Sequence, residues 1–367
     1  MRQDQAKLMV AGLRSLKPYE PGKSIEELQR ELGLSSIIKL ASNENPRAPM
    51  NALNNVLHSL LPEISRYPDG GGYQLKRVLA DRLSVNPAQI TLGNGSNDVL
   101  ELIARAFVEP RLNVIVSEHA FAVYTLVTKS VGADLRVVPA INWGHNLELM
   151  TEAIDQQTRV VFIAHPNNPP GTWVDKSSLV DFLDVVPSDT LVVLDEAYFE
   201  YVEEETYPNS IELLHLYPNL IVTRTFSKIY GLAGLRVGYS VSTTEIAEIL
   251  NRVRQPFNVN SIGNAAALAV LTDERFVIES RTLNSQQLAY VCNSLQTLGL
   301  EWIPSVGNFV SIDFNRPAQT IYERMLHDGV IVRPIANYGL PNHLRMTIGL
   351  EEENSIALDA LSKAIKD

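Results

Sequence analysis

The sequence predicts an α/β fold, with a large domain built on a mostly parallel sheet flanked by helices, and a smaller α+β domain. Three observations support this prediction. The middle of the chain alternates apolar runs rich in β-branched residues with helical patterns, which is typical of parallel strands connected by helices. The C-terminal third instead has long helical patterns followed by short strands. A length of 367 residues suits one large or two unequal domains better than one small core.

The large domain is expected over residues 46–257, while the N-terminal arm, 1–45, joins residues 258–367 in the smaller domain. Four apolar runs are the clearest strands of the large domain, at 113–117, 159–164, 190–195 and 219–224. Each run ends in polar or turn-forming residues. Because ligands of open α/β sheets bind beyond the carboxyl ends of the strands, these polar ends predict a ligand site at one edge of the sheet.

The smaller domain is expected to contain short strands and a closing helix. Its strands are predicted at 308–314, 329–334 and 343–349, and the amphipathic stretch 353–367 predicts the final helix. The sequence contains no internal repeat and no low-complexity linker.

Composition and charge limit the partners of the chain. With 42 acidic and 31 basic residues its formal net charge is −11, which argues against a nucleic-acid or anionic-membrane partner because both attract basic surfaces. Anionic small molecules need only a local cationic pocket. The one cysteine, Cys292, excludes an internal disulfide and a cysteine-built zinc site, and no metal is expected. The N-terminus lacks a signal-peptide core and no run could span a membrane, which predicts a cytoplasmic protein.

Residues 90–107 have the pattern of a strand, a glycine-rich turn and a helix. The free amide groups and the dipole at such a helix start can bind an anion. The stretch lacks the Gly-Lys-Ser/Thr of a P-loop and the third glycine of the dinucleotide fingerprint, which argues against a nicotinamide-dependent oxidoreductase. An ordinary capped helix would give the same pattern, so this turn does not decide the function alone.

Two polar residues at the ends of predicted strands can carry chemistry. Asp195 ends an apolar strand, where a carboxylate must be paired, either by a structural partner or by a ligand. Lys228 follows the strand at 219–224 and stands eight residues before Arg236. A buried lysine beside another cation has a lowered pKa and a nucleophilic amine, whereas a lysine that extends to solvent does not. His165 lies at the same edge and is more simply explained as a structural histidine.

Together these groups suit one cofactor. Thr225, Ser227 and Arg236 provide donors for a phosphate, as does the helix start at 96. Asp195 can hold a proton on a ring nitrogen, and the amine of Lys228 can form a Schiff base with an aldehyde. Pyridoxal 5′-phosphate (PLP) has a phosphate, a protonatable ring nitrogen and an aldehyde, so the set predicts a PLP-dependent enzyme.

Several motifs also resemble a known family. The segment TFSKIYGLAGLRVGY around Lys228, with NNPPG and DEAYFEY upstream, resembles the fold-type I aminotransferases. Further motifs are similar to those of the histidinol-phosphate aminotransferases: SNENP (42–46), RYPDG (66–70), GNGSND (93–98), PFNVN (256–260), VIVRP (330–334) and HLRMTIG (343–349). They cover nearly the whole chain, in the family's order. The resemblance implies transamination of histidinol phosphate with 2-oxoglutarate, giving imidazole acetol phosphate and glutamate, in histidine biosynthesis.

The resemblance assigns roles around the cofactor. Lys228 would form the Schiff base, Asp195 would pair with the ring nitrogen, and Tyr198 would be the third catalytic residue, contacting the ring's phenolic oxygen. The remaining cofactor contacts that it implies are Asn168 at the same oxygen, Phe121 stacked on the ring, and, around the phosphate or near it, Asn94, Gly95, Ser96, Thr225, Ser227, Arg236 and Tyr67.

The resemblance also implies how substrates bind and that the enzyme is a homodimer. Arg345 would bind the carboxylate of the amino-acid substrate, and Arg333 would bind the phosphate of histidinol phosphate. Tyr19 in the arm of a second subunit would cover the imidazole, and Tyr67 would reach the cofactor phosphate from that subunit. The two active sites of a homodimer would therefore be shared.

Two departures from the family pattern and several alternatives stay open. Pro170 stands where the family usually has threonine, and Phe121 where relatives often have tyrosine, which keeps a stacking face but removes a hydroxyl. An aromatic amino-acid aminotransferase and a phosphoamino-acid decarboxylase fit the same fold. A ligand-sensing domain of a transcription regulator is disfavoured, because the residues before SNENP leave no room for a DNA-binding module.

Overall fold

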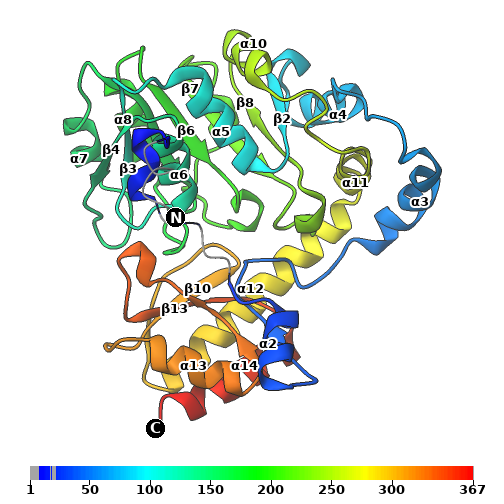
Figure 1. Cartoon of the computed structure of the whole chain (residues 1–367), viewed down its shortest axis with the longest axis vertical. Helices are drawn as coiled ribbons and strands as arrows, with labels where there is room; N and C mark the ends of the chain where they lie inside the picture. Colours follow the sequence, from blue (N-terminus) through cyan, green and yellow to red (C-terminus); the bar gives the residue numbers. More distant parts are fainter. Residues whose placement is uncertain (1–7, 17, 19–21, 367) are drawn as a thin grey trace.

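The computed structural model describes residues 8–16, 18 and 22–366, so the predicted substrate residue Tyr19 lies outside the described residues. In Figure 1 a larger unit with the main sheet lies above a smaller unit, and helix α12 (Glu274–Thr297) runs between them. A helix of 24 residues is about 36 Å long. Its first turn places Val277 in the larger core, and its last turns place Val291 and Leu295 in the smaller core.

The main sheet, in the part of the chain that the structure describes, has seven strands in the order β2-β8-β7-β6-β5-β3-β4. Their bounds are β2 Ile90–Gly93, β3 Asn113–Ser117, β4 Asp134–Val138, β5 Thr158–Ala164, β6 Leu191–Asp195, β7 Leu220–Thr225 and β8 Gly238–Val241. Strand β8 runs antiparallel to both of its neighbours, β2 and β7, and all other pairs of neighbouring strands are parallel. The mostly parallel sheet predicted from the sequence is thus confirmed, and β3, β5, β6 and β7 are the four predicted strands.

Both faces of this sheet are covered by helices. Their bounds are α4 Tyr73–Leu83, α5 Ser96–Phe107, α6 Ala122–Ser130, α7 Leu147–Glu152, α8 Lys176–Val185, α9 Ser210–Leu213, α10 Thr244–Val253 and α11 Ser261–Leu271. Successive side chains of a strand point to opposite faces. Val160 and Phe162 therefore join the core under α5, α6 and α10, whereas Val161 and Ile163 join the core under α4, α7, α8 and α11. Burial on both faces explains why these strands are uninterrupted apolar runs.

The smaller unit is built on an antiparallel sheet of order β12-β13-β10-β9. Its elements are α2 Ile25–Leu32, β9 Glu301–Ile303, β10 Phe309–Asp313, α13 Gln319–His327, β12 Arg333–Pro334, β13 His343–Thr347 and α14 Glu351–Ala364. Helix α14 begins two residues before the predicted helix. Its start is stabilised because the side chain of Glu353 accepts a hydrogen bond from the backbone N–H of Leu350 at 2.7 Å.

The strand predicted at 329–334 is divided between two sheets. Its first half, β11 (Val330–Ile331), pairs in parallel with β1 (Ile38–Lys39), and its second half, β12, pairs with β13. The remaining elements are α3 Met50–Leu60 and the short 3₁₀ turns Ala11–Ser15, Leu61–Glu63, Pro87–Gln89, Phe199–Tyr201, Ala233–Leu235 and Ala336–Tyr338.

Helix α11 packs on α3 and α4, and its residues Ala266, Ala267 and Val270 lie in the larger core. Its small side chains allow this close packing. Residues 261–271 thus pack with the larger unit, although they follow residue 257, where the sequence analysis placed the domain boundary. Among the residues that the structure describes, no helix is long and apolar enough to cross a membrane.

Candidate active site

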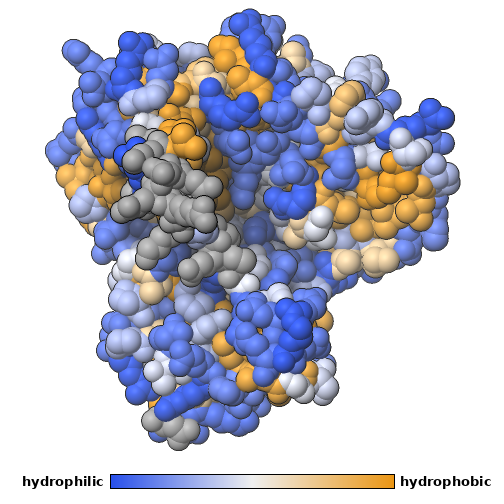
Figure 2. Space-filling model, viewed as in Figure 1, coloured by the Kyte–Doolittle hydropathy of each residue, from blue (hydrophilic) through white to orange (hydrophobic). Residues whose placement is uncertain are grey.

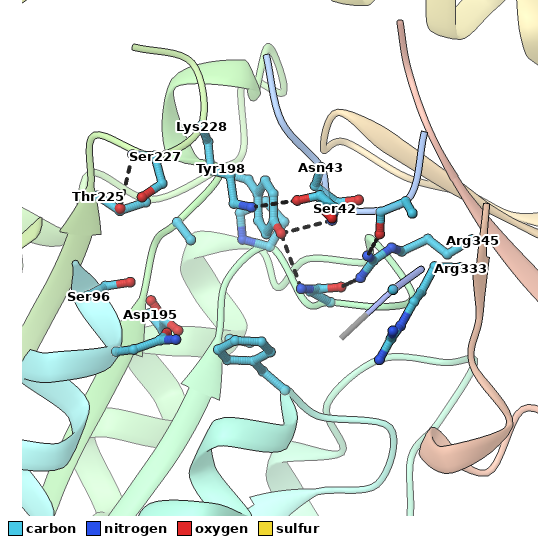
Figure 3. A pocket seen from close by; sticks show the side chains of 18 of the residues that line it. Ser42, Asn43, Ser96, Asp195, Tyr198, Thr225, Ser227, Lys228, Arg333 and Arg345 are labelled. Carbon is cyan, nitrogen blue, oxygen red and sulfur yellow. Dashed lines mark hydrogen bonds between the residues drawn. The ribbon is translucent and has the colours of Figure 1, made fainter. Parts of the chain in front are cut away.

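A cavity lies at the carboxyl ends of three neighbouring parallel strands. The last residues of β5, β6 and β7, which are Ala164, Asp195 and Thr225, all line it. Arg333 and Arg345 of the smaller unit line its other side (Figure 3). The cavity is therefore at the sheet edge where the sequence predicted a ligand site, and both units contribute to it.

Lys228 lies between the two sides of this cavity (Figure 3). Its Nζ donates a hydrogen bond to the carbonyl oxygen of Ser42 at 3.1 Å. Burial and the nearby charges of Arg345 and Arg236 together lower the pKa of Lys228 to about 7, while Glu44 and Asp195 act in the opposite direction. Near neutral pH an amine with this pKa is in its neutral form in a large fraction of molecules, and in that form it can act as a nucleophile or a base.

Asp195 ends strand β6 and is 4% exposed. Its Oδ1 accepts a hydrogen bond from Oγ1 of Thr223 at 2.8 Å, and its Oδ2 accepts one from the hydroxyl of Tyr124 at 2.9 Å. Burial raises the pKa of Asp195, while these two hydrogen bonds lower it. The carboxylate is therefore held in one orientation, in a place where a positively charged partner would stabilise it.

The turn between β2 and α5 is shaped by close backbone approach. Gly95 has a φ of 82°, and a Cβ there would overlap with Nη2 of Arg236. A Cβ on Gly238 in β8 would overlap with the backbone nitrogen of Ser96, the first residue of α5. The glycines thus bring a guanidinium and the free amides of a helix start together, which is an arrangement suited to a phosphate.

Hydroxyl groups of Ser227 and Thr225 lie beside the start of α5 and Arg236. We call this set of donors the anion cradle. Oγ of Ser227 accepts a hydrogen bond from Nη1 of Arg236 at 3.1 Å, and the backbone N–H of Ser227 donates to Oγ1 of Thr225 at 3.1 Å. Ser96, Thr225 and Ser227 lie on the same side of the cavity as Asp195 in Figure 3. Ser96, Thr225, Ser227 and Arg236, which were predicted to surround the phosphate, thus lie together at this side of the cavity.

Hydrogen bonds through Asn168 join Tyr198, on the larger unit, to Arg345 of the smaller unit. Nδ2 of Asn168 donates to the hydroxyl of Tyr198 at 3.1 Å, and Oδ1 of Asn168 accepts from Nη1 of Arg345 at 2.5 Å. Phe121, at the start of α6, also lines the cavity and packs edge-on against Tyr124 with 5.8 Å between ring centroids. The unusual Pro170 leaves Asn168 in this position.

Two arginines face the cavity from the smaller unit. Arg333 and Arg345 are 8% and 7% exposed and stand directly opposite each other across β12 and β13. Of the charged residues that line the cavity, four are cationic and only Asp195 is anionic. In a chain of net charge −11 this concentration of positive charge provides the local pocket that anionic small molecules need.

The structure brings most of the predicted site residues together. Those that line the cavity are Ser96, Phe121, Asn168, Asp195, Tyr198, Thr225, Ser227, Lys228, Arg236, Arg333 and Arg345. Gly95 adjoins Arg236, but Asn94 is exposed and donates its backbone N–H to Asp98. Tyr67 is 82% exposed and stacks on Phe257 with 4.7 Å between ring centroids, outside the cavity.

Residues of the site that were not singled out from the sequence include Tyr124, Thr223 and Asn43. Thr223 could have been found, because it lies two positions before Thr225 on a strand and so faces the same side. His165 is fully buried, its Nε2 lies 2.8 Å from the carbonyl oxygen of Val174, and burial lowers its pKa to about 4. It is a structural histidine, as the sequence favoured.

These residues fit PLP. Gly95 and Gly238 leave the room that side chains would fill beside a helix start and Arg236, as a phosphate requires. A buried Asp195 and a lysine of lowered pKa stand within the same cavity. The described residues contain no cluster of three or more histidine, cysteine or acidic side chains that could hold a metal ion.

The fold and this site define a PLP-dependent aminotransferase, and comparison with known proteins agrees. The family model for class I and II aminotransferases matches residues 35–361, so the chain belongs to that family. A histidinol-phosphate aminotransferase of Sinorhizobium meliloti, solved with pyridoxal 5′-phosphate, superposes with a TM-score of 0.90 at 30% identity, covering 98% of this chain and 97% of that one. The predicted fold-type I architecture and cofactor are confirmed.

Curated relatives refine the assignment. Histidinol-phosphate aminotransferase 2 of Pseudomonas fluorescens is 54% identical over 367 residues, which is all of this chain and 99% of that protein. The enzyme of the same name from Pseudomonas aeruginosa is 54% identical over 356 residues, or 96% of each chain. Within its class the chain is a member of the histidinol-phosphate aminotransferase family, and the resemblance seen in its motifs is confirmed.

Proposed function

We propose that this enzyme transfers an amino group between histidinol phosphate and 2-oxoglutarate, the reaction of histidine biosynthesis that yields imidazole acetol phosphate and glutamate. The observation that carries the proposal is the pair of buried arginines, Arg333 and Arg345, opposite the Lys228 side of one cavity. The names of relatives at 54% identity support this substrate. They do not favour the aromatic aminotransferase or the decarboxylase.

PLP, when bound, accepts the electron pair left on the substrate Cα after proton removal. Asp195 supplies the negative charge that keeps the ring nitrogen protonated. Lys228, with a pKa near 7, takes the proton from Cα and later returns it to the cofactor side. Tyr198 and Asn168 would position the cofactor ring relative to Lys228, and Phe121 would stack on the ring.

The anion cradle and its surroundings hold the cofactor phosphate in this proposal. The groups assigned to that phosphate are the amides of Gly95 and Ser96, the side chains of Thr225, Ser227 and Arg236, and Tyr67 from a second subunit, with Asn94 close by. All of these groups except Tyr67 and Asn94 lie together at the start of α5, which supports their assignment. Helix dipole and guanidinium then act on the same charge.

Substrate recognition is assigned to the two arginines. Histidinol phosphate has a phosphate and no carboxylate, whereas glutamate has two carboxylates, so one cavity must accept both. Arg333 is proposed to bind the phosphate and Arg345 the carboxylate of the amino-acid substrate. A planar guanidinium binds either group with two hydrogen bonds, which allows one site to serve both ligands in turn.

We also propose a homodimer with shared active sites. Large apolar residues are exposed around α3 and the turn after it, including Met50, Leu61, Ile64 and Tyr67, with exposed fractions of 51% to 82%. Figure 2 shows hydrophobic residues gathered on the right, over the place of α3 in Figure 1. Such a patch is typical of a protein interface. Sedimentation of the holoenzyme at micromolar concentration should give a dimer, and a fully active monomer would contradict this.

In the same proposal residues 46–257 bind the cofactor, while the arm 1–45, which includes Tyr19, and residues 258–367 form the smaller domain that covers the substrate, with α11 of that part packed on the larger unit. A cytoplasmic location fits small charged substrates, because charged groups cross a lipid bilayer poorly. Cell fractionation with an antibody to the protein tests this location.

The proposed reaction is tested by absorbance spectroscopy of the purified enzyme with PLP. Wild type should show the cofactor band of a lysine adduct, which Lys228→Ala alters. Histidinol phosphate should convert that band to the amine form, while phenylalanine does so poorly. A faster conversion by phenylalanine would identify an aromatic aminotransferase, and release of carbon dioxide without keto-acid consumption would identify a decarboxylase.

A further inference from the structure

A short segment before α3, residues 41–43, contacts the site beside Lys228 (Figure 3). The carbonyl oxygen of Ala41 accepts a hydrogen bond from Nη2 of Arg345 at 2.8 Å, and that of Ser42 accepts one from Nζ of Lys228. The next residue, Asn43, is 1% exposed and lines the same cavity with its side chain. Asn43 also forms a hydrogen bond within the site through its side-chain amide.

The hydroxyl oxygen of Tyr198 accepts hydrogen bonds from two amides. Nδ2 of Asn43 lies 2.9 Å away, and Nδ2 of Asn168 lies 3.1 Å away. A hydroxyl has one proton to donate and two lone pairs to accept with. Because both lone pairs are occupied, the proton of Tyr198 is left to point elsewhere, and Tyr198 lines the cavity.

The orientation of the Asn43 amide is set by strand β13. The backbone N–H of Asn43 donates to Oγ1 of Thr347 at 2.9 Å, and Oγ1 of Thr347 donates its own proton to Oδ1 of Asn43 at 3.2 Å. The threonine hydroxyl therefore holds the oxygen end of the amide. With Oδ1 held by Thr347, the donor end of the amide, Nδ2, faces Tyr198.

The backbone of Asn43 has a φ of 54°, in the left-handed region. Asparagine and aspartate enter this region more readily than other residues with a side chain. Aspartate would fit the same backbone, but it has an acceptor oxygen in place of Nδ2. Of these two residues, only asparagine presents a donor to Tyr198 here.

We propose that Asn43 is a positioning residue: together with Asn168 it fixes the Tyr198 hydroxyl as a hydrogen-bond donor to the cofactor, and Thr347 sets its orientation. This inference rests on the proposed function, because it assigns Tyr198 to the cofactor. Strand β13 is then linked to Tyr198 by two chains of hydrogen bonds. One runs from Arg345 through Asn168, and the other runs from Thr347 through Asn43.

The electrostatics of Tyr198 agree with a permanent donor. Burial raises its pKa to about 12, while the charge of Arg345 and the hydrogen bond from Asn43 act in the opposite direction. The other groups that face it are Asp195 and Tyr338, which both raise its pKa, and Lys228, whose Nζ is 5.5 Å from the ring centroid. The hydroxyl thus keeps its proton throughout the pH range of an activity measurement.

The test compares Asn43→Ala and Asn43→Asp with wild-type holoenzyme. Loss of one buried hydrogen bond at the reacting group should lower kcat about tenfold with little change in KM for histidinol phosphate. Without substrate, the pH midpoint at which the bound cofactor's absorbance changes should rise by about half a pH unit or more. The midpoint rises because a donor to the ring's phenolic oxygen stabilises negative charge there. Asn43→Asp should show the larger effect, since it accepts the Tyr198 proton.

Thr347 provides a matched pair of variants that leaves Asn43 in place. Thr347→Val removes the hydroxyl that orients the amide and should shift the midpoint in the same direction, whereas Thr347→Ser should restore the wild-type value. If Asn43→Ala fails to fold, the comparison of Thr347→Val with Thr347→Ser is sufficient to test the proposal. A lower melting temperature with unchanged kcat and unchanged midpoint in Thr347→Val and Asn43→Ala would overturn the proposal. An inactive wild type would instead contradict the proposed function, because the midpoint requires no substrate.

Discussion

A Cβ atom on Gly95 would overlap with the guanidinium of Arg236. The turn that starts α5 and the arginine that follows Lys228 by eight residues are therefore fitted to each other, although 141 positions separate them in the chain. Gly95 also has a φ of 82°, which residues with a side chain rarely adopt. Position 95 therefore requires glycine for two separate reasons: the close approach of Arg236 and the positive φ of the backbone. An experiment can distinguish the two.

Gly95→Ala should weaken cofactor binding at least about tenfold, because displacement of Arg236 removes a charged hydrogen bond to the phosphate. Binding of PLP is measured by absorbance titration of apoenzyme. Gly299→Ala is the matched control: Gly299 also has a positive φ of 69°, but a Cβ there would meet no heavy atom within 4 Å. It should lose stability and keep PLP affinity. Equal affinities for the two variants would show that the close approach of Gly95 to Arg236 does not contribute to cofactor binding.

The two arginines should differ in their effect on the two substrates. Arg333→Gln should reduce kcat/KM for histidinol phosphate about 10- to 100-fold, the contribution of a charged hydrogen bond, and affect glutamate less. Arg345→Gln should impair glutamate strongly, and it also removes the hydrogen bond to Asn168. Half-reactions followed by cofactor absorbance give each value separately. Equal losses for both substrates with Arg333→Gln would remove its assignment to the phosphate.

The lowered pKa of Lys228 makes the stability of the apoenzyme depend on pH. Between about 7, its pKa in the folded protein, and 10.5 in the unfolded chain, the unfolded state binds the extra proton. The free energy of unfolding therefore rises with pH across this window. Below about pH 7 the amine is protonated in both states, and the folded state carries the full free-energy cost of burying its charge. Apo Lys228→Met should be more stable than wild type at pH 6.5, by on the order of 2–4 kcal/mol, and the gap should close by pH 10.

Melting temperatures of the two apoproteins, measured from pH 6 to pH 10, check this prediction. The wild-type curve should rise relative to that of Lys228→Met as pH increases. Parallel curves would show that Lys228 has the same pKa in the folded and unfolded states, which would contradict the lowered pKa.

The sequence was sufficient to predict the elements that a single local pattern determines. Strand β3 occupies 113–117 as predicted, because a parallel strand buried on both faces needs an uninterrupted apolar run. Asp195 and Lys228 were predicted for the same kind of reason, since each follows such a run at the edge where ligands bind. The family motifs then added residues that no local pattern explains, such as Arg333.

The rest depended on contacts between distant parts of the chain. The split of 329–334 into two strands follows from pairing of β11 with β1, nearly 300 residues earlier. The helical pattern at 261–271 does not specify which core it covers. Asn43 meets Thr347 across 304 positions, and only the folded structure shows that its amide is held there.

Tyr124 has its hydroxyl 2.9 Å from Oδ2 of Asp195, and its ring stacks on Phe162 with 4.8 Å between centroids. Tyr124→Phe should keep this packing and remove one hydrogen bond that lowers the pKa of Asp195. The pKa should rise, so Asp195 becomes protonated more readily and loses the charge that holds the proton of the ring nitrogen.

The fall in activity of Tyr124→Phe should therefore be greatest on the acid side, about tenfold in kcat/KM near pH 6 and less above pH 8. Its acid limb should move to higher pH, which a pH profile from 5.5 to 9 measures directly. Tyr217→Phe is the control, because that hydroxyl donates to Asp184 near the surface, at 2.6 Å, and should leave the profile unchanged. A loss of the same size at every pH would mean that Tyr124 supports the fold around Asp195 and does not tune its charge.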